Sequence, residues 1–95
     1  MSRREYEIDI VFNGKEIKKL IIDPHFELKH ADSVNDEIIL KLVKMLDGQN
    51  VDPQKVTPPF SYFAEELTLS GKRFRLIWLV EDDHIYIGVV NAYRR

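Results

Sequence analysis

Three strand-like segments follow one another at the C-terminal end of the chain, with only short turns between them. They are residues 61–69, 72–80 and 85–93, and all three are rich in β-branched and aromatic side chains. Ser70-Gly71 separates the first two, and the acidic run 81–84 separates the last two. Strands joined by such short turns pair antiparallel with their neighbours in sequence. This part of the chain is therefore predicted to form a three-stranded antiparallel meander.

The N-terminal segment predicts a β-hairpin. Residues 5–12 place apolar side chains at every second position, which is typical of a half-buried strand. Asn13-Gly14 follows, and this dipeptide readily adopts the positive φ angles of a two-residue type I′ turn. Residues 15–23 are therefore expected to return antiparallel to the first strand.

Two helices are predicted between the hairpin and the meander. Asp23-Pro24 is typical of a helix start, and a short helix is expected over 25–31. Ser33, with an acidic residue three positions later, resembles a capping box, and apolar residues then recur with helical spacing. These features predict one long helix over 33–47.

The remaining segment, 48–59, is polar and contains three of the four prolines, so it is predicted to be a loop. The expected element order is β-β-α-α-β-β-β. The fold class is thus α+β, a single domain over 1–95, with the long helix covering one face of an antiparallel sheet.

The composition excludes several kinds of function. The chain has no cysteine, so it has no disulfide, no thiolate metal ligand and no thiol nucleophile. No apolar run reaches the length of about 18 residues that a membrane-spanning helix needs, so no membrane association is expected. A cytoplasmic location is predicted because the absence of cysteine suits a reducing compartment. The formal net charge is −2, but the positive charges cluster near residues 72–75 and at the C-terminus.

The turns predict a register for the meander. With Ser70-Gly71 at the centre of the first turn, Glu66 lies opposite Arg75 and Thr68 opposite Arg73. With 81–84 as a four-residue loop, the predicted partners are Val80 with Ile85, Trp78 with Ile87, Leu76 with Val89, Arg75 with Val90 and Arg73 with Ala92.

In this register one face is apolar and packs beneath the long helix. One end of the opposite face is expected to carry Glu66, Thr68, Arg73, Arg75 and Arg94. Tyr93 borders the same groove in this prediction. Arg95 and Lys72 are expected to be solvated and solubilising.

These residue types suit the cleavage of RNA through its own 2′-hydroxyl group. The reaction needs a base for the 2′-proton, an acid for the 5′-oxygen and cations for the charge that develops on phosphorus. Glu66 is the candidate base, and His30 or Tyr93 is the candidate acid. Arginine matches two phosphate oxygens at once, so Arg75 is assigned to the transition state and the neighbouring cations to substrate binding. No metal or cofactor is required.

Other interpretations apply to the same residues. Glu66 opposite Arg75 is also an ordinary cross-strand ion pair. A small binding or regulatory module would use the basic strand edge to bind nucleic acid or an acidic protein segment without chemistry. Alternatively, the acidic helix face of Asp36, Glu37 and Asp47 would let the protein inhibit a basic partner.

A helical segment followed by a meander, with arginines in KRFRLIWLV and a last strand ending in NAYRR, resembles the RelE/ParE toxins. It is also similar to the wider ribonuclease group of barnase, EndoU and the colicins. The resemblance covers residues 60–95 best, and FELKHADSVNDEIILKLV looks like the histidine-bearing helical entry of some phage- and plasmid-borne members.

This resemblance implies a bacterial, metal-independent endoribonuclease that acts on RNA, including ribosome-bound mRNA, and is held inactive by a small antitoxin protein. It also implies that Arg73, Arg75, Tyr93 and Arg94 serve the scissile phosphate, with His30 as an additional candidate.

Overall fold

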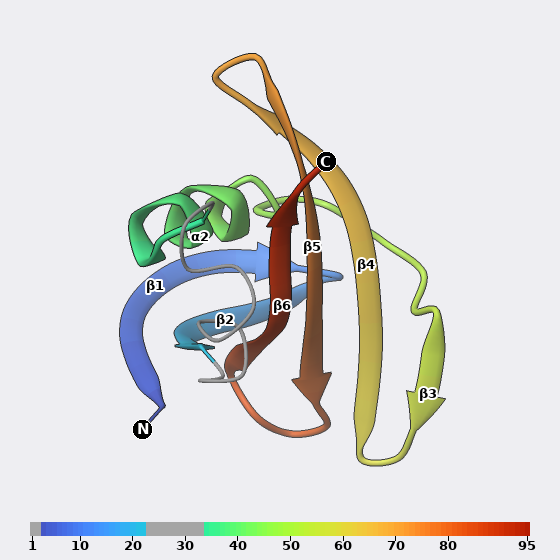
Figure 1. Ribbon diagram of the computed structural model, residues 1–95. Helices are drawn as coiled ribbons and strands as arrows, with labels where there is room; N and C mark the ends of the chain where they lie inside the picture. Colours follow the sequence, from blue (N-terminus) through green and yellow to red (C-terminus); the bar gives the residue numbers. More distant parts are fainter. Residues whose placement is uncertain (1–2, 23–33) are drawn as a thin grey trace.

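The computed structural model describes residues 3–22 and 34–95, and these ranges form a six-stranded sheet and a helix (Figure 1). The elements in chain order are β1 (Arg4–Phe12), β2 (Lys15–Ile22), α2 (Asp36–Lys44), β3 (Lys55–Thr57), β4 (Phe60–Leu69), β5 (Lys72–Glu81) and β6 (Tyr86–Arg94). The strand order across the sheet is β1-β2-β6-β5-β4-β3. β2 and β6 run parallel, whereas all other neighbouring strands run antiparallel.

The predicted fold class, an α+β domain with two helices over an antiparallel meander, is wrong. The described chain is mainly a curled mixed sheet, and it carries one short helix. The N-terminal hairpin is not a separate unit, because β2 joins the meander by pairing with β6. The segment 48–59, predicted to be a loop, supplies the edge strand β3. The short helix predicted over 25–31 lies outside the described residues.

The predicted N-terminal hairpin is confirmed. β1 and β2 pair antiparallel, and the turn residues Asn13 and Gly14 have φ angles of 52° and 73°. Both angles lie in the left-handed region that a type I′ turn requires. The dipeptide therefore determines this turn directly.

The helix is shorter than the predicted range 33–47. Asn35 is the N-cap, and its side-chain oxygen accepts a hydrogen bond of 2.9 Å from the backbone N–H of Ile38. Ser33, the predicted cap, lies outside the described residues. α2 ends at Lys44, and the next residues form i→i+3 backbone bonds that tighten the last turn.

Three aromatic rings close the curled sheet around its core. The Phe12 ring of β1 lies edge-on to Phe63 of β4 and to Trp78 of β5, with centroid distances of 5.1 and 5.6 Å. Phe63 and Trp78 stack at 5.4 Å. β1 is an edge strand separated from β5 by β2 and β6, so this contact requires the sheet to bend back on itself, as Figure 1 shows. Truncating such a buried ring costs about 3–5 kcal/mol of folding free energy.

The predicted apolar face of the meander is confirmed except at Ile85, which was expected on this face but is exposed. Leu76, Trp78, Ile87 and Val89 are fully buried. The buried side of α2 packs into the same core with three residues, Ile39, Leu42 and Val43. The opposite face of the sheet, which we call the open face, is available to position functional groups.

Asp36 fastens the start of α2 to β1. Its carboxylate accepts two hydrogen bonds from the Arg4 guanidinium, at 2.6 and 2.8 Å, and a third from the Tyr6 hydroxyl. The hydrogen bonds from Arg4 lower the pKa of the Asp36 carboxyl against the opposing effect of burial, and the bond from Tyr6 lowers it further. The folded state therefore favours the charged carboxylate.

Replacing Asp36 by Asn should make stability less dependent on acid. At neutral pH the substitution should cost about 1–3 kcal/mol, because it breaks charge-assisted bonds to Arg4. A carboxyl group whose folded pKa is lowered stabilises the fold above its unfolded pKa of about 3.9, and this contribution is lost as the pH falls through the folded value. Urea unfolding at a series of pH values should therefore show the two proteins converging below about pH 4.

Asp9→Asn is the matched control. Asp9 is an exposed carboxylate that pairs with Lys18, so its loss should leave stability almost unchanged at every pH. A gap between wild type and Asp36→Asn that stays constant down to the acid transition would contradict the proposed role of Asp36.

Candidate phosphate-binding site

The predicted register between β4 and β5 is confirmed. Glu66 lies directly opposite Arg75, and Thr68 lies directly opposite Arg73. Ser70 and Gly71 form the turn, with φ angles of 54° and 76°. The two-residue turn therefore brings these four side chains to the open face, as the sequence predicts.

The predicted register between β5 and β6 is wrong. Trp78 lies opposite Val89 instead of Ile87, a shift of two positions that leaves each side chain on its predicted face. Val90 then has no partner in β5, because the pairing moves from Val89 to Asn91. Such a β-bulge adds one residue and exchanges the faces of everything that follows.

The bulge decides where the C-terminal residues lie. Tyr93 lies opposite Arg75 on the open face, whereas Arg94 lies opposite Phe74 on the side that α2 covers. Arg95 continues the ladder, and its backbone N–H donates a hydrogen bond of 2.9 Å to the carbonyl of Arg73. The predicted grouping of Arg94 with the open-face arginines is therefore wrong. Arg95 takes the position beside Arg73 that was predicted for Arg94.

Two adjacent rows of side chains thus cross the open face at this end of the sheet. Glu66, Arg75 and Tyr93 form the inner row, on β4, β5 and β6. Thr68, Arg73 and Arg95 form the outer row, on the same three strands and at the C-terminal end of β6. We call both rows together the open-face cluster, which consists of Glu66, Thr68, Arg73, Arg75, Tyr93 and Arg95.

The carboxylate of Glu66 bridges two arginines of the cluster. One oxygen lies 3.6 Å from a nitrogen of Arg73, and the other lies 3.5 Å from Nε of Arg95. Arg75 is half-buried and makes no ion pair within residues 3–22 and 34–95. Three arginines against one carboxylate leave the cluster with a formal charge of +2 (3 − 1 = +2). The cluster therefore carries more positive charge than Glu66 neutralises.

A shallow depression lies at the outer row. It is lined by Arg73, Tyr93, Arg94 and Arg95, with Arg75 in the next row. Thr68 lies beside it and is exposed. His30, the other candidate acid, lies outside the described residues. The structure thus brings together five of the seven predicted site residues and places Arg94 at the border between the two sides of the sheet.

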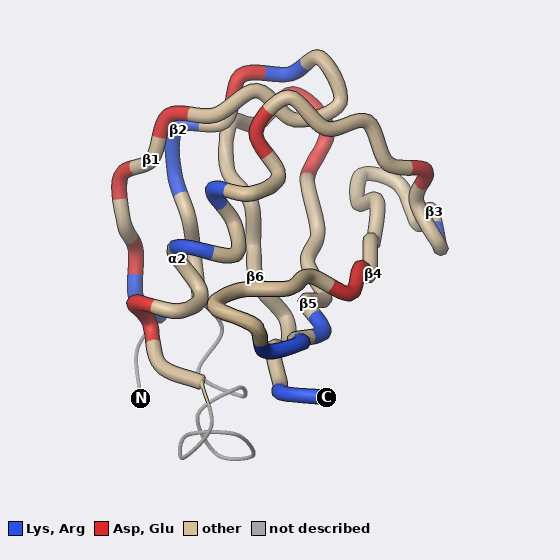
Figure 2. Tube along the Cα trace, turned by 90° about the horizontal axis from the view of Figure 1, so that it is seen from above, with Lys and Arg blue, Asp and Glu red and all other residues tan. Residues whose placement is uncertain are grey.

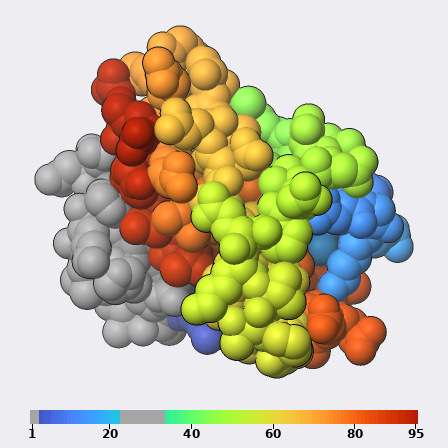
Figure 3. All heavy atoms as spheres, turned by 90° about the vertical axis from the view of Figure 1, so that its right-hand side faces the viewer, coloured from blue at the N-terminus to red at the C-terminus, as the bar shows by residue number. Residues whose placement is uncertain are grey.

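Positive charge gathers at this end of the molecule on both sides of the sheet. Figure 2 shows the Lys and Arg segments grouped around the start of β5 and the C-terminus. In Figure 3 the end of β6 and the turn between β4 and β5 lie together at the top of the molecule. Lys41 and Lys72 line a hollow on the helix side, and Arg95 lines the open-face depression, although no sequence pattern marks any of the three as a site residue. The arginine run at the C-terminus was the available signal, but nothing in the sequence indicates the bulge.

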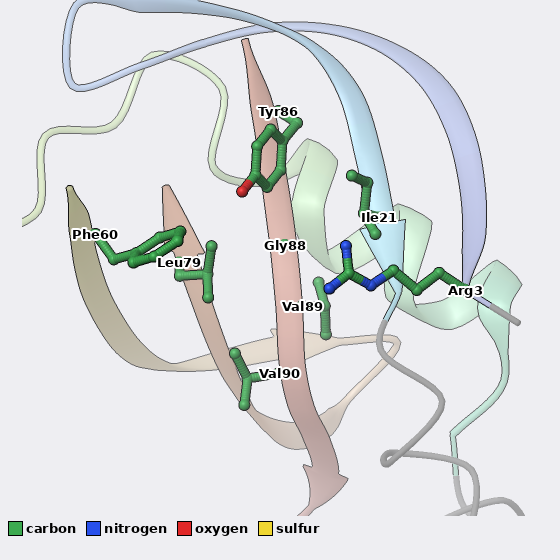
Figure 4. A pocket seen from close by; sticks show the side chains of 8 residues that line it. All are labelled: Arg3, Ile21, Phe60, Leu79, Tyr86, Gly88, Val89 and Val90. Atoms are coloured by element: carbon green, nitrogen blue, oxygen red, sulfur yellow. The ribbon is translucent and has the colours of Figure 1, made fainter. Parts of the chain in front are cut away.

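The middle of the open face carries an apolar pocket of about 150 Å³ (Figure 4). The Phe60 ring lies beside Leu79, the Tyr86 ring stands next to Gly88 on the same strand, and the Arg3 guanidinium points toward the same space. A side chain at Gly88 would approach Leu79 to 3.2 Å, so glycine keeps the floor of the pocket low. The pocket therefore offers two aromatic side chains on the same face of the sheet as the open-face cluster, toward the other end of the strands.

Tyr86 is held in place by a carboxylate. Its hydroxyl donates a hydrogen bond of 2.7 Å to Glu81. Burial, together with this bond, raises the pKa of Tyr86 to about 12. The ring consequently stays neutral and oriented over the ordinary pH range.

The described ranges contain no group of three or more His, Cys, Asp or Glu side chains that could hold a metal ion. They also contain no helix that is long and apolar enough to cross a membrane. Comparison with protein-family models, with curated proteins and with solved structures found no match.

The charge arrangement predicts opposite effects of two substitutions on the binding of inorganic phosphate. Glu66→Gln removes the carboxylate that competes for Arg73 and Arg95, so affinity should rise by up to about fivefold. Arg75→Ala removes the unpaired guanidinium, and affinity should fall by roughly tenfold or more. Titration at low salt, followed by NMR, measures both changes.

Lys44→Ala is the control for general charge effects. Lys44 is an exposed cation at the end of α2, outside the cluster. If removing Lys44 weakens phosphate binding as much as removing Arg75 does, the affinity reflects overall charge and the site is contradicted.

Proposed function

We propose that the open-face cluster binds a phosphodiester of RNA and that the protein is a metal-independent endoribonuclease. The observation that carries this proposal is the row formed by Glu66, Arg75 and Tyr93 on three adjacent strands. Across the sheet the row supplies a carboxylate, then a guanidinium without an ion pair among the described residues, then a phenol. Two further arginines lie beside it.

The arginines suit a phosphate group. A guanidinium presents paired N–H donors that match two phosphate oxygens, and bonds between charged groups are the stronger class of hydrogen bond. The distances from Glu66 to Arg73 and Arg95, 3.6 and 3.5 Å, are longer than a direct hydrogen bond. A phosphate entering the depression would therefore replace weak ion pairs by short ones and release the carboxylate.

In the proposed reaction the released Glu66 carboxylate takes the proton of the ribose 2′-hydroxyl. The 2′-oxygen attacks phosphorus, and Arg73, Arg75 and Arg95 stabilise the negative charge that develops on the phosphate oxygens. The bond from phosphorus to the 5′-oxygen then breaks, and the Tyr93 hydroxyl donates a proton to this leaving group. The products are a 2′,3′-cyclic phosphate and a free 5′-hydroxyl, and the reaction requires no metal.

The apolar middle of the open face suits the bases of the same RNA. Leu79, at the apolar pocket, is four residues from Arg75 on β5, which corresponds to about 13 Å along the strand. Aromatic side chains stack on bases without strong sequence preference. Phe60, Tyr62 and Tyr86 would therefore hold bases farther along the same RNA strand, at the other end of the open face.

The resemblance to the RelE/ParE toxins suggests a cellular role for such an activity. We propose that the protein acts on mRNA in the cytoplasm, either as the toxin of a toxin–antitoxin pair or as a nuclease of a mobile element. An antitoxin that covers the cationic end would block the depression, so an acidic surface is expected on that partner.

A non-enzymatic binding module is the second candidate. It is favoured by the position of Glu66, because its carboxylate is already engaged by two guanidinium groups, those of Arg73 and Arg95. The same cationic end would then bind nucleic acid or an acidic protein segment without cleaving it.

The test compares RNA cleavage by the wild type with that by Arg75→Lys and Glu66→Gln, in the presence of EDTA. Cleavage by the wild type should leave 2′,3′-cyclic phosphate ends. Arg75→Lys keeps the charge but loses the two-donor geometry, so the rate should fall by roughly 10²–10³. Glu66→Gln should stop cleavage while RNA binding is retained.

Expression of the wild type and Arg75→Lys in bacteria tests the cellular role, since only the wild type should arrest growth. Lys44→Ala serves again as the folded control with unchanged cleavage. A folded wild type that binds RNA but leaves it intact would overturn the nuclease and support the binding module. A folded wild type that binds no RNA would overturn both.

A further inference from the structure

We propose a second phosphate subsite on the helix-facing side of the sheet, formed by Lys41, Lys72 and Arg94. This inference deepens the proposed function and rests on it in one respect, namely that the open-face cluster binds RNA. The substrate class that it implies is single-stranded RNA that passes around the end of the sheet and contacts both sides.

The three cations converge on one hollow of about 200 Å³. Lys41 comes from α2, Lys72 from the start of β5 and Arg94 from the end of β6. Ser70, in the turn before β5, adds a hydroxyl group to the lining. The rest of the lining is apolar and consists of Ile38, Leu69 and Phe74. Three separate elements thus place positive charge around one space. The hollow is therefore more than a row of surface lysines along a single helix or strand.

These cations are largely free to bind an anion. Lys72 and Arg94 make no ion pair in the described part of the chain. Lys41 lies 3.5 Å from Glu37, but this is an exposed i,i+4 pair on one helix. Such pairs are weak and are readily exchanged for a phosphate contact.

Chain connectivity joins this subsite to the open-face cluster. Lys72 lines the helix-side hollow, and the next residue, Arg73, lines the open-face depression. Arg94 lines both, and the next residue, Arg95, lines the depression. The C-terminus and the turn between β4 and β5 form a common rim between the two sides, as Figure 3 shows. A flexible single strand can follow this rim, whereas duplex DNA, with a persistence length of about 50 nm, resists so sharp a bend.

The test uses the salt dependence of binding to a single-stranded RNA of about 12 nucleotides, a length within the range of known single-strand sites. A 2′-O-methyl group at each position blocks the attacking 2′-oxygen and so prevents cleavage. Each phosphate contact that is lost should reduce the slope of log K against log salt concentration by about 0.7. Lys72→Ala and Arg94→Ala should each produce this reduction, and the double variant should produce about twice as much. Lys44→Ala should leave the slope unchanged.

A dinucleotide separates the two subsites. It is too short to pass around the sheet end, so its affinity should depend on Arg75 and be unaffected by Lys72→Ala, the substitution that is confined to the helix-side hollow. An unchanged salt slope for the long RNA in both variants would overturn the second subsite. Equal losses on the dinucleotide and the long RNA would also overturn it, because they would indicate a general charge effect.

The outcome is independent of catalysis. If the wild type binds the long RNA without cleaving any RNA, but the two variants still reduce the salt slope, the second subsite is supported and the nuclease is overturned. If the wild type cleaves a dinucleotide while the salt slope does not respond to the variants, the nuclease is supported and the second subsite is overturned.

Discussion

The pairing of β6 with β5 is the constraint on which the rest of the structure depends. β6 is the central connection of the sheet, because it pairs antiparallel with β5 on one side and parallel with β2 on the other. Its register puts Val89 and Ala92 into the core. In a regular strand, residues three positions apart point to opposite faces, so both can be buried on one side only because the bulge at Val90 shifts the alternation by one residue. Burial of both side chains therefore requires the bulge, and the bulge determines which arginine faces which side.

The core makes this arrangement rigid enough to position a site. The contacts of Phe12 with Phe63 and Trp78 tie the edge strand β1 to the centre of the meander. The open-face cluster stands on the other side of the same strands, so its spacing is set by backbone ladders. Side chains presented by strands are held more precisely than those on loops. The positions of Glu66 and Arg75 thus follow from packing on the opposite face.

The sequence predicts those parts of the structure that local chemistry controls. The turns at Asn13-Gly14 and Ser70-Gly71 determine their hairpins, and the second places Glu66 opposite Arg75. The parallel pairing of β2 with β6 depends on residues far apart in the chain, and no local pattern indicates it. The bulge at Val90 leaves no composition signal either, since valine fits any strand position. Burial of side chains in the core thus decides which side of the sheet each residue after Val90 faces. Sequence reasoning without the bulge therefore predicts the wrong side for Arg94.

The central claim is that a phosphodiester binds at the open-face cluster. The most direct measurement is an NMR titration of the protein with a non-cleavable RNA dinucleotide that contains a 2′-deoxy residue. We expect saturable shifts that are concentrated at Glu66, Arg75 and Tyr93 and at the side chains of Arg73 and Arg95, with a phosphorus signal that moves in parallel. Shifts that are spread evenly over the cations of the molecule, Lys44 included, or no shifts at all, would contradict it.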